Sequence, residues 1–281
     1  MTPVPLVHCS ALAGVDFTSR PSRRKPITVA LGHSAHGVVQ LEEVRTHADF
    51  ESFALWLRSP GPWLAVFDLP FGLPRELVQT LGWPMQWRAL MAHYAGLSRA
   101  EIRNTFAAFC DARPVGGKFA HRKADKPAGS SPSMKWVNPP VAFMLHAGVP
   151  LLIEAGLHLP GLHDGDGQGC GRIGLEGYPG LLAREVLGRR SYKSDDKARQ
   201  TPERLLARVD LIAALEQGRT RLGLHLALSN AQREELAADA SGDQLDAVLC
   251  LVQAAWASSQ PNHGLPHDID PLEGWIVTAD C

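Results

Sequence analysis

Residues 63–74 read Trp-Leu-Ala-Val-Phe-Asp-Leu-Pro-Phe-Gly-Leu-Pro and carry the clearest structural signal in this 281-residue chain. Residues 63–67 are apolar without alternation, which predicts a strand whose two sheet faces are both covered. The strand runs into Asp68 and then into a turn punctuated by prolines. We therefore expect a carboxylate at the rim of a sheet, at the end of a buried strand.

A similar arrangement occurs near the N-terminus, where the apolar strand predicted over 11–17 contains Asp16. A turn rich in Pro, Ser, Arg and Lys follows, and then two further short strands are predicted at 27–32 and 37–44. Strands joined by such short linkers are usually antiparallel neighbours. A helix predicted over 48–57 from its apolar spacing leads into the next strand.

The remainder of the chain is mainly helical in pattern. Helices are predicted over 85–97, 99–110, 140–155, 201–217, 231–240 and 242–258, long loops over 113–137 and 157–171, and strands over 172–178 and 274–278. Strands followed by alternating helices and strands are typical of an α/β protein. The sequence thus predicts a mixed β-sheet flanked by helices in a single domain, residues 1–281, with a large helical and loop insertion at about 75–170 between the fourth and fifth strands.

Composition excludes several classes of protein. The 28 Lys and Arg residues nearly balance the 29 Asp and Glu residues, which excludes a uniformly basic nucleic-acid coat but not a local basic face. The five cysteines are odd in number and contain no Cys-x-x-Cys pair, so a disulfide framework and a thiolate zinc site are not expected. The start of the chain lacks a secretory pattern, and the longest apolar stretch, 139–159, is interrupted by polar residues, glycines and a proline. We expect a cytoplasmic protein without a membrane segment.

Acidic residues recur at the ends of predicted buried elements. Asp16, Asp68 and Glu176 each stand at a strand end, and Asp243 and Asp246 lie three residues apart on one face of an apolar helix. Singly, each is also explained by a turn, a helix N-terminus or a pair with an arginine. Together they would repel one another unless a cation lay among them, and oxygen ligands favour magnesium or manganese. The set predicts a metal site able to activate water for phosphodiester hydrolysis.

Five short motifs occur in a fixed order along the chain: Gly14-Val15-Asp16-Phe17, Phe67-Asp68-Leu69-Pro70-Phe71-Gly72-Leu73-Pro74, Glu176-Gly177-Tyr178-Pro179, Gly242-Asp243-Gln244-Leu245-Asp246-Ala247 and Glu273-Gly274-Trp275-Ile276. In this order they resemble a family of domains of unknown function predicted to be RNase H-like nucleases. The resemblance spans residues 12–277 and implies an RNase H-like fold.

The resemblance also implies a set of metal ligands. In the wider RNase H-like superfamily, which includes Holliday-junction resolvases, acids on the first strand, the fourth strand and a helix bind the metals. The matching positions are Asp16, Asp68 and either Asp243 or Asp246. Glu176 lies in a motif of the family, although a carboxylate on that strand is not a standard ligand of the superfamily. The first-helix acid of true RNase H has no clear counterpart.

Basic residues gather in two segments that would suit a phosphate backbone or, alternatively, would be solvated loop charges. Residues 184–208 contain eight Lys and Arg residues against four acids, and a second cluster lies within 113–126. Lys193 and Arg204 fit the family pattern after the Tyr-Pro motif and are predicted to contact substrate phosphate. Tyr192, beside Lys193, is a candidate for stacking on an unpaired base.

The prediction is therefore a nuclease that hydrolyses phosphodiester bonds of DNA or RNA with bound Mg or Mn. Its catalytic candidates are the five acids named above, of which Asp16, Asp68 and Asp246 are the predicted metal ligands. Two alternatives stay open: a phosphotransferase of the actin-like or sugar-kinase type, with Asp16 holding a nucleotide-bound magnesium, and a non-catalytic RNase H-like binding module. The oligomeric state is not predicted.

Overall fold

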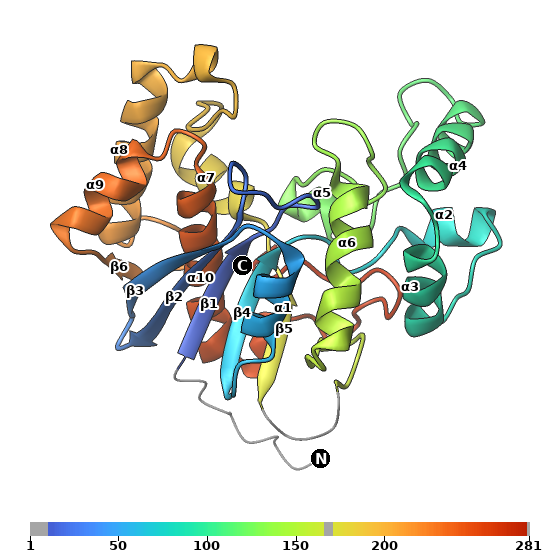
Figure 1. The fold of residues 1–281 in the computed structure, drawn as a ribbon, viewed down its shortest axis with the longest axis horizontal. Coiled ribbons are helices and arrows are strands. Elements are labelled where there is room, and N and C mark those ends of the chain that lie inside the picture. Colours follow the sequence, from blue (N-terminus) through green and yellow to red (C-terminus); the bar gives the residue numbers. More distant parts are fainter. Residues whose placement is uncertain (1–10, 166–170, 280–281) are drawn as a thin grey trace.

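The computed structural model describes residues 11–165 and 171–279, in which six strands form one mixed sheet (Figure 1). The strands are β1 (Ala11–Asp16), β2 (Ile27–Ala35), β3 (Val38–His47), β4 (Trp63–Asp68), β5 (Arg172–Glu176) and β6 (His225–Ala227), in the order β5-β4-β1-β2-β3-β6. β2 is antiparallel to β1 and β3, whereas β4 is parallel to β1 and β5. The mixed α/β sheet predicted from the sequence is confirmed.

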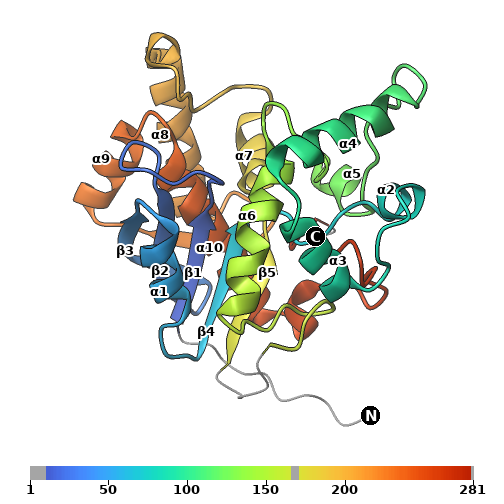
Figure 2. The ribbon, with the colours of Figure 1, turned by 45° about the vertical axis from the view of Figure 1, so that its right-hand side comes forward.

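Helices cover both faces of the sheet (Figures 1 and 2). One face packs against α1 (Phe50–Leu57) and α6 (Val141–Glu154), and the other against α7 (Pro179–Leu187), α8 (Pro202–Glu216) and α10 (Asp243–Ser259). The other helices are α2 (Arg75–Thr80), α3 (Trp87–Ala95), α4 (Arg99–Asp111), α5 (Asp125–Ala128) and α9 (Asn230–Ala238), with short 3-10 turns at Lys197–Arg199 and Pro261–Gly264. Helices α2 to α6 lie between β4 and β5 in the chain, where the insertion was expected.

The central strand β1 joins the two cores because its side chains alternate between the faces. Leu12 belongs to the apolar cluster on the α10 side, and Ala13 and Val15 belong to the cluster on the α1 and α6 side. Gly14 faces α10 at very short range, since a Cβ there would lie 2.1 Å from the carbonyl oxygen of Ala247 and the amide nitrogen of Leu251. The absence of a side chain at Gly14 thus lets α10 lie directly on β1.

Five elements differ from the sequence prediction. Strand β6, only three residues long, pairs with β3 and was not predicted, because so short a segment has no readable periodicity. Helices α2, α5 and α7 were also not predicted, and α5 lies within the loop expected over 113–137. The strand expected over 274–278 is wrong: Ile276 makes a single parallel bridge with Glu176, and no ladder forms.

The structure bears on two of the compositional expectations. Within residues 11–165 and 171–279, no helix is both long and apolar enough to cross a bilayer. Cys110 and Cys250 are buried free thiols, and the other three cysteines, Cys9, Cys170 and Cys281, lie outside the described residues.

Candidate metal centre

Two of the predicted acids lie side by side because the strands that carry them are neighbours. β1 and β4 are parallel and in register, with Asp16 directly beside Asp68. Leu12 of β1 and Leu64 of β4 pack toward α10, and the alternation of side chains places both aspartates on that same face. The sheet therefore presents two carboxylates together at one rim.

The third acid comes from the first turn of α10. Asp246 is fully buried, and its carboxylate meets those of Asp16 and Asp68, with one oxygen of each residue within 4.8 Å of the others. We call these three residues the aspartate triad. The close approach of α10 to Gly14 of β1 brings the helix N-terminus to the strand ends.

Asp246 also has two partners from the segment that precedes α8. The Tyr192 hydroxyl donates a hydrogen bond to one carboxylate oxygen of Asp246, and the Lys193 ammonium group donates to the other. Tyr192 is buried but lines the cavity that Asp68 and Lys193 also line, and its stacking on a base stays a prediction. Its hydroxyl contact was missed because nothing in the sequence links Tyr192 to a residue on α10.

Asp243, the alternative to Asp246, lies outside the aspartate triad. Its carboxylate accepts a hydrogen bond from Lys25 at 2.7 Å, and Lys25 also contacts Asp195 at 2.7 Å. Lys25 lies in the basic turn between β1 and β2. Its closeness to Asp16 in the sequence is the feature that could have indicated that Lys25 lies near the site. Of the two helix acids, the structure thus brings Asp246 to the strand ends.

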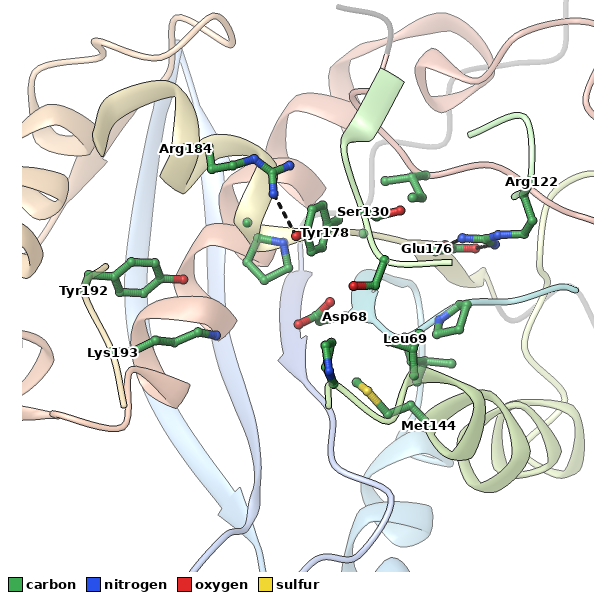
Figure 3. Close-up of a pocket in the computed structure, with 18 residues that line it drawn as sticks. Asp68, Leu69, Arg122, Ser130, Met144, Glu176, Tyr178, Arg184, Tyr192 and Lys193 are labelled. Carbon is green, nitrogen blue, oxygen red and sulfur yellow. Dashed lines mark hydrogen bonds and ion pairs between the residues drawn. The ribbon is translucent and has the colours of Figure 1, made fainter. Parts of the chain in front are cut away.

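Glu176 belongs to a neighbouring ion-pair cluster. Its carboxylate accepts two hydrogen bonds from the Arg122 guanidinium, at 2.6 and 2.7 Å, and one from the amide of Phe71 at 2.9 Å. Arg122 also pairs with Asp125 at 2.9 Å, and all three charged groups are buried. In Figure 3, Arg122 and Glu176 lie on one side of Asp68, and Lys193 and Tyr192 lie on the other.

The triad has an excess of negative charge that the protein does not neutralise. Burial, followed by the charge of Asp246, raises the pKa of Asp68 to about 7. Burial, Asp246 and Asp243 raise the pKa of Asp16 well above its ordinary value. Burial opposes the charge on Lys193, but Asp246 and the other nearby acids nevertheless raise the pKa of its ammonium group well above the ordinary value. Among the described residues, the Lys193 ammonium group makes the direct ion pair with the triad, and the charge of Lys25 also acts on Asp16.

The triad opens onto a cleft of about 730 Å³. Asp16, Asp68 and Lys193 line this cleft, together with the basic side chains of Arg24, Lys25 and Lys197. Arg204, the second predicted phosphate contact, instead donates to the backbone carbonyl of Lys193 and supports the loop that carries it. The cleft is wide and charged, as a site for a polyanion would be.

Comparison with models of known protein families, with curated proteins and with solved structures found no match to this chain. The family resemblance of the five sequence motifs stays a prediction.

Proposed function

We propose that this chain is a nuclease with an RNase H-like fold, which hydrolyses nucleic-acid phosphodiester bonds with divalent metal held by Asp16, Asp68 and Asp246. The observation that supports the proposal is the meeting of three carboxylates within 4.8 Å at a sheet rim. Their origins on the first strand, the adjacent fourth strand and a helix match those that the motif resemblance implies. We also infer that the protein acts in the cytoplasm, where its buried thiols at Cys110 and Cys250 would stay reduced.

The donor set fits a hard divalent cation. Carboxylate oxygens are preferred ligands of magnesium and manganese. Within the described residues, neither Asp16 nor Asp68 has a hydrogen-bond donor for its carboxylate, and burial and nearby acids raise the pKa of both groups. The oxygens of such carboxylates are free to bind a further group, and their negative charge is not balanced by a partner. A cation would bind these oxygens and balance the charge.

A divalent cation at such a site would lower the pKa of a bound water and stabilise negative charge that develops on phosphate oxygens. The protein contributes the fixed positions of the ligands, since Asp16 and Asp68 are held by paired strands and Asp246 by a buried helix. Lys193, in contact with Asp246 and lining the cleft, places an ammonium group where a substrate phosphate would lie. Lys25 and Arg24 extend the positive surface along the cleft.

The test combines manganese binding with cleavage of labelled single-stranded DNA and RNA in the presence of Mg or Mn. We expect the wild-type protein to bind manganese by calorimetry and to cleave at least one of the two strands. Asp16→Asn and Asp68→Asn should each abolish cleavage and weaken manganese binding. Asp210→Asn is the matched control, because it removes an equal charge from an exposed position of α8 that does not line the cleft.

The outcomes separate the proposal from its alternatives. Manganese binding without cleavage of either strand would reject the nuclease, and absence of manganese binding would favour the non-catalytic binding module. Unchanged cleavage in both Asp16→Asn and Asp68→Asn would place the chemistry elsewhere in the protein.

A further inference from the structure

A second cavity of about 330 Å³ adjoins the aspartate triad (Figure 3). We call it the side pocket, and its apolar wall includes Leu69, Val141, Met144, Tyr178, Pro179 and Ile276. Asp68 and Lys193 line both the side pocket and the open cleft. A molecule whose reacting group lies at the triad therefore has the side pocket directly beside it.

The size of the side pocket suits one monomer of a polymer. Pockets that bind small ligands have volumes of roughly 300–1,000 Å³, and the side pocket is at the lower end of that range. Its wall is assembled from the end of β4, the start of α6, the start of α7 and the C-terminal segment. An apolar enclosure of this size favours a compact, mainly apolar group over an extended charged chain.

Of the charged groups in the wall, all but Asp68 already have partners among the described residues. Arg184 donates to the Tyr178 hydroxyl at 2.9 Å and to the carbonyl of Ala128 at 2.6 Å. Arg122 is engaged by Glu176 and Asp125. A phosphate in the side pocket would have to displace these contacts, whereas a neutral planar ring would not. The Ser131 hydroxyl, at the same wall, is able to hydrogen-bond to the edge of such a ring.

We infer that the side pocket receives one unpaired nucleobase of the strand whose phosphodiester lies at the aspartate triad, an inference that rests on the proposed function. The open cleft carries Arg24, Lys25 and Lys197 and suits the backbone, while the side pocket suits the base. In a duplex every base is stacked and paired, so the substrate is a single strand or a strand with a base rotated out of the helix.

The first experiment measures base binding without cleavage. A mononucleotide is added to the metal-free protein, and saturation transfer from protein to base protons is recorded by NMR. Val141→Trp fills the side pocket from α6, and Ser131→Trp fills it from a loop, where an added ring disturbs no helix packing. The control is Val137→Trp, which adds the same ring at a nearby exposed position outside the pocket lining.

We expect transfer to the base protons in the wild type and in Val137→Trp, and its loss in both filled variants. Retained manganese binding by the filled variants shows that they are folded. The inference is overturned if the wild type shows no transfer to the base, or if folded variants with the pocket filled show as much transfer as the wild type.

The second experiment measures cleavage of an intact single strand against the same strand with one abasic position at the cleavage point. Loss of a stacked base should reduce the wild-type rate on the order of tenfold. Val141→Trp should cleave the two strands at equal rates, because neither can use the pocket. Equal rates in the wild type overturn the inference. If the wild type cleaves neither strand, the proposed function fails, and the mononucleotide experiment alone still decides whether the pocket binds a base.

Discussion

The three aspartates of the triad have unequal surroundings. Asp246 receives the Tyr192 hydroxyl and the Lys193 ammonium group, while Asp16 and Asp68 receive no hydrogen bond from any residue that the structure describes. Buried carboxylates without donors disfavour their own ionised form. Ionised Asp16 and Asp68 therefore destabilise the metal-free protein, which favours their protonated forms, and a bound cation would stabilise the ionised forms.

The first prediction concerns the pH dependence of this penalty. The pKa of Asp68 is about 7 in the folded protein and near the ordinary 3.8 when unfolded, so between these values the folded state binds more protons. The Asp68 contribution to stability is therefore lost as the pH rises toward 7. Asp68→Asn should raise the unfolding free energy of the metal-free protein by on the order of a few kcal/mol at about pH 8 and change it little at about pH 4.

Urea unfolding at the two pH values measures this difference. Asp210→Asn, at an exposed position of α8, should show neither effect. An equal change in stability at both pH values would show that Asp68 is not the group that titrates.

The second prediction concerns the Tyr192 hydroxyl. Tyr192→Phe removes a buried donor from the Asp246 carboxylate, and a hydrogen bond to a charged group contributes about 1.5–3 kcal/mol. Thermal and urea unfolding should show a loss of this size. Tyr178→Phe is the control, because its hydroxyl bonds to Arg184 in a more exposed place and should matter less. Equal losses of stability in the two variants would show that the hydrogen bond from Tyr192 to Asp246 contributes no more than the exposed hydrogen bond of Tyr178.

At the scale of elements, the contact between β1 and α10 determines where the third carboxylate lies. The backbone of α10 packs directly against Gly14 of β1, and the nearest helix atoms include the carbonyl oxygen of Ala247. Asp246 directly precedes Ala247 on that helix. A helix displaced from β1 would carry Asp246 away from Asp16 and Asp68. The sheet and the helix thus form the metal centre jointly.

The third prediction follows from this contact. Gly14→Ala places a methyl group 2.1 Å from the backbone of α10, so the helix must move, at a cost of about 1–3 kcal/mol or more. Both the unfolding free energy and the affinity for manganese should fall. Gly96→Ala, where a Cβ makes only ordinary contacts, should change neither. A Gly14→Ala protein with wild-type manganese affinity would contradict the proposed coupling.

At the scale of the whole molecule, one buried cluster connects the insertion to the sheet. Arg122, just before α5, binds Glu176 at the end of β5 and the carbonyl of Glu273 near the C-terminus at 3.1 Å. The Glu273 carboxylate accepts hydrogen bonds from the amides of Lys123 and Arg75, at 2.8 and 2.7 Å. Arg122, Glu176 and Ile276, which come from the insertion, β5 and the C-terminal segment, also line the side pocket.

The fourth prediction concerns this cluster. Arg122→Met leaves Glu176 and Asp125 as buried charges without their partner, which typically costs about 3–5 kcal/mol. The double variant Arg122→Met with Glu176→Gln should recover part of that loss, as measured by urea unfolding. Manganese affinity of Glu176→Gln should stay near that of the wild type, and a large loss would make Glu176 a ligand after all.

Local patterns were sufficient for the main features of this protein. Uninterrupted apolar runs indicated the buried strands, helical spacing indicated α8 and α10, and the acids at the ends of these runs indicated Asp16, Asp68 and Asp246. Each of these features depends on residues that are neighbours in the chain. The same reasoning could not identify β6, because a strand of three residues exists through its pairing with β3.

The partners of the charged side chains depended on the folded arrangement. Asp243 and Asp246 lie on one face of the same predicted helix, yet Asp243 pairs with Lys25 and Asp246 with Lys193, across 218 and 53 residues of chain. Glu176 and Asp68 both stand at the end of a strand, but of these two acids only Glu176 forms an ion pair with Arg122 from the insertion. A buried charge is stabilised by whichever group lies within a few ångströms, and that proximity is set by the packing of elements distant in sequence.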